Sequence, residues 1–136
     1  MEVKLLNDNL WYPTDKIFIN GQWKDCNSKK RLPIENPSNG EVIAEISDSC
    51  EIDIDEAVNS ASKALDNSWG DLTASERGRL LLKLSELVRN RIDKLAIIES
   101  FDVGKPLKQA KSDALALARY FEFYGGASDK IMGETI

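Results

Sequence analysis

The segment IFINGQWK, residues 17–24, decides how the fold begins, because Asn20-Gly21 stands between two short runs that suit β-strands. Asn-Gly is the strongest short-range hairpin signal, since both residues of a type I′ turn take positive φ. Extended runs follow at residues 31–36 and 41–46, separated by a Pro-Ser-Asn-Gly turn. Pro33 suits an edge strand because it has no N–H to donate. Together these strands predict a small β-meander.

Two amphipathic helices are expected next. Asp53 is predicted to cap the first, with Glu56 as its capping-box partner, and Gly70 to stop it. A second capping box at residues 73–76 opens the next helix, whose apolar stripe continues to about Phe101.

A third helix is predicted from about Pro106, because proline suits the first turn of a helix. Gly125-Gly126 either ends it or marks close packing within a longer helix. Residues 1–16 are polar and mixed and are expected to form an arm, and residues 17–136 show no linker. The apolar stripes predicted to face the core are Ile54, Val58, Ala61 and Leu65; Leu80, Leu84, Leu87, Val88, Ile92 and Leu95; and Leu107, Ala110, Ala114, Leu117 and Phe121.

Composition excludes several classes of function. Among 136 residues, 18 Lys and Arg stand against 23 Asp and Glu, so the net charge is −5. Binding to nucleic acid needs a concentrated basic surface, so no nucleic-acid partner is expected. With 42% hydrophobic and 30% charged residues the chain is typical of a soluble globular protein. The N-terminus lacks a signal-peptide pattern and no apolar run approaches a membrane span, so a cytoplasmic protein without a membrane partner is expected.

The chain has no histidine, which excludes His-based nucleophile activation and His-ligated zinc. Its two cysteines, Cys26 and Cys50, are too few for a four-thiolate metal site. They allow one disulfide, but free thiols in a reducing compartment are the expectation. Cys26 is predicted to be an ordinary exposed loop thiol, and Cys50 precedes the first helix without an evident base.

No motif of catalytic strength is present. Residues 102–105, DVGK, lack the spacing of a phosphate loop, and Gly125-Gly126 lacks that of a dinucleotide-binding turn. The carboxylates of residues 53–56 are predicted to stabilise a helix N-terminus. Aromatic residues are predicted to lie in the core rather than around a cofactor: Trp69, Tyr120, Phe121, Phe123 and Tyr124.

The order of several short motifs resembles the N-terminal segment of the NAD(P)-dependent aldehyde dehydrogenase superfamily. Within it, the sequence is most similar to the betaine-, aminoaldehyde- or phenylacetaldehyde-like branches. The motifs cover nearly the whole chain: FINGQW at 18–23, ENPSNGEVIAEI at 35–46, DEAV at 55–58, SERGRLL at 75–81, ESFDVGKP at 99–106 and YGGASDKIMGE at 124–134.

The resemblance implies an α/β parent enzyme of which residues 17–136 form the N-terminal part of the cofactor-binding domain. In that family a cysteine forms a thiohemiacetal with the aldehyde, hydride passes to NAD or NADP, and a glutamate activates water. The cysteine stands in a Phe-x-x-x-Gly-Gln-x-Cys motif that these 136 residues lack, so neither Cys26 nor Cys50 inherits its role. The dinucleotide turn, the general base and the oligomerisation strands are also expected to be absent, the first such strand falling about at Ile136. No cofactor is expected on this chain alone.

The same resemblance implies two sites, one for a monovalent cation and one at the mouth of the substrate tunnel. The backbone carbonyl of Glu35 and the carboxylate of Asp102 correspond to an internal monovalent-cation site; the alternative is that Asp102 caps the helix starting near Pro106. Asp113, Ala116 and Leu117 correspond to the mouth of the substrate tunnel, where Asp113 is otherwise a solvated surface carboxylate.

Three functions follow as hypotheses. In the first, the chain is the N-terminal portion of an aldehyde dehydrogenase, inactive alone, and its partner is the remainder of the enzyme or like subunits. In the second, it is a truncated structural or interaction fragment that associates with itself or with full-length subunits. A free-standing binding module requires the motif order to be a coincidence.

Overall fold

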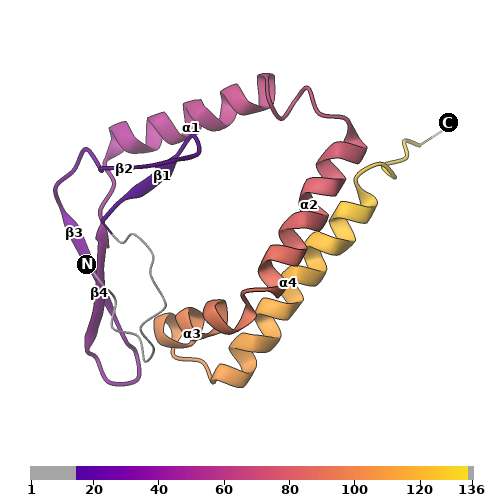
Figure 1. Cartoon of the computed structure of the whole chain (residues 1–136). Coiled ribbons are helices and arrows are strands. Elements are labelled where there is room, and N and C mark those ends of the chain that lie inside the picture. The colour runs from indigo at the N-terminus through magenta and orange to yellow at the C-terminus, as the bar shows by residue number, and fades with distance from the viewer. Residues whose placement is uncertain (1–14, 135–136) are drawn as a thin grey trace. The chain divides into compact units, whose positions relative to one another are not determined.

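The computed structural model describes residues 15–134, and these divide into two compact units (Figure 1). The first unit holds residues 15–67 and 101–104, and the second holds residues 68–100 and 105–134. The predicted arm, residues 1–16, lies outside the described residues except for its last two. No helix between residues 15 and 134 is long and apolar enough to cross a membrane.

The first hairpin of the first unit joins β1 (Ile17–Ile19) to β2 (Gln22–Lys24). Asn20 and Gly21 have φ values of 53° and 74°, so the predicted turn is confirmed. Phe18 pairs with Trp23 across the strands, and their ring centroids lie 5.0 Å apart. This contact stabilises a hairpin of only three residues a strand.

A second hairpin joins β3 (Arg31–Glu35) to β4 (Val42–Ser47), and Pro33 stands opposite Glu45 in an edge strand as predicted. The prediction of a single meander was wrong, because in the described part of the chain each hairpin forms its own two-stranded sheet. Residues 25–30 separate β2 from β3. Asn27 in this loop donates to Asp53, so the loop is tied to a helix instead of making a tight turn.

Helix α1 (Glu51–Asp66) follows β4 and contacts β1. Its N-cap is Cys50, so the prediction of Asp53 as the cap was wrong. Asp53 occupies the third helical position, where its carboxylate accepts the N–H of Cys50 at 3.0 Å. The helix also ends before Gly70, at a turn in which the Asn67 side chain donates to the Lys63 carbonyl at 2.8 Å.

The remaining helices are α2 (Ala74–Arg89), α3 (Ile92–Val103) and α4 (Leu107–Ala127). The expectation of three helices after the strands was wrong, since α2 and α3 replace one predicted helix. The chain turns at Asn90 and Arg91, where the N–H of Arg91 bonds to the Val88 carbonyl at 2.9 Å. Asn90 is a poor helix former. The apolar stripe keeps its phase across the turn, so periodicity does not reveal it.

In the second unit α2 and α4 run antiparallel side by side (Figure 1). Helix α4 includes both glycines and ends at Ala127, and of the two only Gly125 packs closely against α2. Ser85, buried on α2, donates its hydroxyl to the Ala118 carbonyl of α4 at 2.7 Å. The buried residues of α4 are small: Ala110, Ala114, Ala118 and Gly125. Small residues therefore let the two helix backbones approach closely.

The core of the described residues contains few large side chains. The apolar residues it buries are Ile19, Ala44, Val88, Ala96, Ala110, Ala114 and Ala118, and the largest fully buried side chain is that of Asp53. The prediction that the aromatic residues lie in the core was wrong for four of them: Trp69, Tyr120, Phe123 and Tyr124 are exposed, while Phe121 is half-buried. The stripe of α1 is exposed as well, because nothing in the described residues covers it.

Candidate functional site

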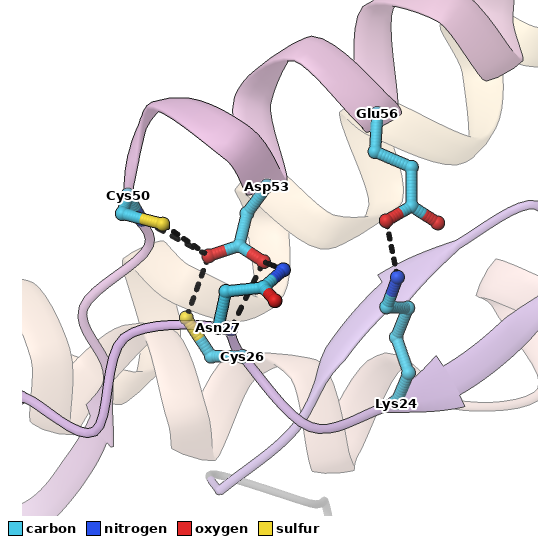
Figure 2. A network of polar contacts seen from close by, with 6 residues as sticks. All are labelled: Lys24, Cys26, Asn27, Cys50, Asp53 and Glu56. Atoms are coloured by element: carbon cyan, nitrogen blue, oxygen red, sulfur yellow. Dashed lines mark hydrogen bonds and ion pairs between the residues drawn. The ribbon is translucent and has the colours of Figure 1, made fainter.

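A buried carboxylate organises the polar contacts of the first unit (Figure 2). Asp53 is only 1% exposed and accepts five hydrogen bonds. Its Oδ2 accepts from the Cys26 thiol at 3.0 Å, the Cys50 N–H at 3.0 Å and the Cys50 thiol at 3.3 Å. Its Oδ1 accepts from the Asn27 N–H at 3.1 Å and the Asn27 side-chain amide at 2.7 Å.

These donors hold the pKa of Asp53 well below its usual range. The Cys26 thiol contributes most and the Cys50 N–H next, while burial opposes them. A carboxylate with a lowered pKa and five hydrogen-bond donors is a poor general base. The cluster of Cys26, Asn27, Cys50 and Asp53 is therefore suited to a structural role. It ties the loop after β2 to the start of α1, and beside it Lys24 forms an ion pair with Glu56 (Figure 2).

Cys26 differs from its prediction as an ordinary exposed thiol. It is half-buried, and it also donates to the Asp48 carbonyl at 3.4 Å. Both cysteines are free in the structure. Among residues 15–134, no group of three or more His, Cys, Asp or Glu side chains is placed to hold a metal ion.

A second charged cluster lies in the second unit, where Lys105 bridges two carboxylates. Its ammonium lies 2.6 Å from Glu99 Oε1 and 3.0 Å from Asp113 Oδ2, and Asp113 also accepts from Gln109 at 2.9 Å. The Lys105 ammonium, and then Gln109, lower the pKa of Asp113. The two carboxylates in turn raise the pKa of Lys105. Asp113 is therefore a paired carboxylate, and its side chain is still 43% exposed.

The three predicted tunnel-mouth residues lie on α4, in two different hollows. Asp113 and Leu117 line a hollow of about 260 Å³ with an apolar wall of Leu95, Ile98 and Ala114. Ala116 lines the other, of about 440 Å³, with Arg119, Tyr120, Phe123 and Tyr124. The structure thus brings Asp113 and Leu117 together with Glu99 around one hollow, while the neighbouring Ala116 lines the other.

The predicted cation site lies in the first unit. Glu35 ends β3, and Asp102 lies in the last turn of α3. Asp102 does not cap α4, whose N-cap is Pro106. The segments that follow these two residues meet, because a Cβ placed on Gly104 would stand 2.7 Å from Pro37 Cγ. The cation site itself stays a prediction.

Sequence reasoning missed Lys105, Glu99 and Asn27. Gln109 and Asp113 lie four residues apart on one face of α4, and Lys105 stands just before the helix, a pattern that could have signalled the cluster. Asn27 carries no local signal, since its bonds to Asp53 join positions 26 residues apart.

The sequence is similar to known proteins of one enzyme family. The sequence profile described as "Aldehyde dehydrogenase family" matches residues 23–136. Human retinal dehydrogenase 2 is 42% identical over 131 residues, which are 94% of this chain and 25% of that protein. Betaine aldehyde dehydrogenase of Bacillus subtilis is 38% identical over 121 residues, or 88% of this chain and 25% of that protein.

Solved structures agree with the sequence matches. An aldehyde dehydrogenase structure from Burkholderia cenocepacia is 49% identical with a TM-score of 0.86, covering 89% of this chain and 25% of that one. Betaine aldehyde dehydrogenase from Staphylococcus aureus, solved with NAD+, is 29% identical with a TM-score of 0.83, covering 90% and 25%. The chain thus spans about a quarter of the relatives' length. With residues 23–136 matched by the family profile, it belongs to the aldehyde dehydrogenase family.

Proposed function

We propose that this chain supplies the N-terminal quarter of an enzyme that oxidises an aldehyde to a carboxylic acid with NAD or NADP. The observation that carries the proposal is the family match over residues 23–136, which aligns with 25% of the length of the relatives. In this arrangement residues 17–136 form the N-terminal part of the cofactor-binding domain, and the chain's partner is the remainder of the enzyme.

Exposed apolar side chains support a large partner surface. Phe18 and Trp23 are 58% and 54% exposed on the first hairpin, and Ile54 and Val58 are 55% and 58% exposed on α1. On α4, Phe123 is 68% exposed. Extensive exposed apolar surface marks interaction sites. Each Å² covered contributes about 25 cal/mol, so the rest of the enzyme gains stability by packing on these faces.

The Lys105 cluster supports a substrate channel on the second unit. In the proposed enzyme, Asp113 and Leu117 lie at the channel mouth with Ala116 nearby, and the apolar wall of their hollow contacts the aldehyde's tail. The relatives' names include retinal and betaine aldehyde, one apolar and one cationic. Because Lys105 neutralises one of the two carboxylates beside it, one net negative charge remains for a cationic aldehyde.

The same proposal keeps the monovalent-cation site at Glu35 and Asp102. The Pro37–Gly104 approach supports it by bringing the two segments together. A carbonyl and a carboxylate are oxygen donors of the kind that hard cations prefer.

Activity measurements on the 136-residue chain test the first part of the proposal. The chain contains no Phe-x-x-x-Gly-Gln-x-Cys motif, so we expect no aldehyde-dependent NADH or NADPH formation. Production of reduced cofactor that depends on both aldehyde and chain overturns the prediction of inactivity.

Complementation tests the second part. The chain is co-expressed with a Bacillus subtilis betaine aldehyde dehydrogenase that lacks its own matched quarter, and activity and co-purification are measured. We expect both to require this chain, and to fall when Phe123→Asp places a charge on the exposed α4 face. Asn59→Asp, which adds the same single negative charge at an exposed position of α1, is the control for added negative charge.

The alternative is a fragment that associates with itself or with full-length subunits. The exposed faces favour this as well, because two copies can cover each other's apolar surface. Three measurements separate this alternative from the first proposal: light scattering for the oligomeric state, denaturation for cooperativity of unfolding, and co-purification for binding to the enzyme remainder. A defined oligomer that unfolds cooperatively and does not bind the remainder supports the self-associating fragment.

A further inference from the structure

We propose that Cys26 and Cys50 form a reversible disulfide, which makes the start of α1 a redox-sensitive modification site. Cys26 lies in the loop after β2, and Cys50 is the N-cap of α1. The inference rests only on the first unit and is independent of the proposed enzymatic role.

The two thiols share one acceptor. Both sulfurs point at Oδ2 of Asp53 (Figure 2), at 3.0 Å from Cys26 and 3.3 Å from Cys50. The sulfurs can therefore be no farther apart than the sum of these two distances. An S–S bond of about 2.05 Å needs a closer approach of the two sulfurs, which the proposal assigns to rotation of both side chains about their Cα–Cβ bonds.

Neither cysteine is fully buried. Both cysteines are free and only partly buried, unlike Asp53 beneath them. Neither belongs to a strand or to the interior of a helix: one sits in a loop and the other at an N-cap, so ladder and helix hydrogen bonds need not break for the sulfurs to meet.

The chemical step is thiol–disulfide exchange with a low-molecular-weight disulfide such as oxidised glutathione. One protein thiolate attacks the glutathione disulfide, forms a mixed disulfide and releases one glutathione thiol. The second protein thiolate then attacks the protein sulfur of that mixed disulfide and releases the other glutathione thiol. The two protein sulfurs lose two electrons in all, the glutathione sulfurs gain two, and both thiol protons leave with glutathione.

Closing the disulfide changes the surroundings of Asp53. Both S–H donors leave Oδ2, which keeps only the Cys50 N–H, while Asn27 continues to bond Oδ1. The loop after β2 is then held to α1 by a covalent bond in place of the hydrogen bond from the Cys26 thiol, in addition to the two bonds from Asn27. A cross-link of this kind also restricts the unfolded chain, which raises stability.

Glutathione redox buffers test the proposal on the 136-residue chain. The oxidised chain is expected to lose two hydrogen atoms in mass and to retain no glutathione. Trypsin cuts after Lys24, Lys29, Arg31 and Lys63, so the expected product is residues 25–29 linked to residues 32–63. Cys26→Ser and Cys50→Ser each leave one thiol and should give only the mixed disulfide.

The effective concentration of the thiols separates a built site from chance encounter. In strong denaturant a flexible chain joining them gives a value on the order of 1 mM, and we expect the native chain to exceed it at least ~10-fold. Far-UV circular dichroism of the same sample serves as the control that the native chain is folded and helical during the measurement. A native value at or below the denatured one, or products limited to mixed and intermolecular disulfides, overturns the proposal.

Discussion

Gly78 of α2 and Gly125 of α4 face each other so closely that a Cβ placed on Gly78 would stand 2.6 Å from the Gly125 carbonyl oxygen. The reverse approach is also tight, because a Cβ on Gly125 would stand 3.0 Å from the Gly78 carbonyl oxygen. Since Ser85 and Ala118 also bond across these helices, the α2–α4 pair depends on backbone proximity along its length.

Gly78→Ala should therefore destabilise the chain. The added methyl group meets backbone, which cannot rotate away as a side chain can. Overpacking of this kind costs about 1–3 kcal/mol of unfolding free energy, measured by urea denaturation followed by circular dichroism.

Gly126→Ala is the control, because this glycine follows Gly125 in the facing helix α4 and a Cβ there meets nothing within 4 Å. Alanine favours helix, so the control should gain roughly 0.5–1 kcal/mol. Equal effects of the two changes would contradict the close approach.

Gly104 and Gly40 separate conformational strain from steric contact. Both have positive φ, 71° and 72°, but only Gly104 has a neighbour in the way, since Pro37 Cγ stands 2.7 Å from its built Cβ. Gly40→Ala should cost about 1 kcal/mol for the left-handed conformation alone. Gly104→Ala should cost roughly 2–4 kcal/mol, because overlap with the proline ring is added. Similar losses in the two variants would show that Pro37 does not restrict the turn.

Much of the local structure follows from residues that are near in sequence. The Asn20-Gly21 turn was predicted because both residues need positive φ, which they have. The capping box of α2 was predicted because a threonine is followed three residues later by a glutamate, and in the structure the Thr73 N–H donates to the Glu76 carboxylate at 2.8 Å. Such contacts span four residues or fewer.

Features set by distant contacts were missed. Asn27 and Cys26 bind Asp53 across more than 25 positions, so neither the separation of the hairpins nor the site at the start of α1 is visible locally. The turn at Asn90 was hidden because the apolar phase continues through it. Periodicity also identifies an apolar face without showing whether anything covers it, which is why Phe123 and its aromatic neighbours were misassigned to the core.

Ser85 offers a test of the polar contact between α2 and α4. Ser85→Ala removes a buried hydroxyl that bonds the Ala118 carbonyl at 2.7 Å, and should cost ~1 kcal/mol of unfolding free energy. Ser112 makes the same type of bond, to the Lys108 carbonyl at 3.2 Å, but it is exposed and local. Ser112→Ala should change stability by less than about 0.5 kcal/mol. A loss at Ser112 as large as that at Ser85 would mean that burial of the bond is unimportant.

Asp53 predicts a specific dependence of stability on pH. Its pKa is lowered in the folded chain, chiefly by the Cys26 thiol, so folding favours the ionised form. The resulting stability is fully present above the unfolded pKa of about 3.9, and it is lost as pH falls through the lower folded value.

Asp53→Asn replaces one accepting oxygen by an NH2 group, which faces N–H or S–H donors and cannot accept their hydrogen bonds. This change should lower the thermal midpoint at pH 7 by roughly 5–10 °C. The gap from the original chain should narrow below about pH 4, as the original chain loses this contribution. Asp55→Asn, at an exposed position of the same helix, should leave the midpoint nearly unchanged. A gap between the original chain and Asp53→Asn that stays constant from pH 7 to pH 2 would show that the carboxylate's charge does not contribute to folding.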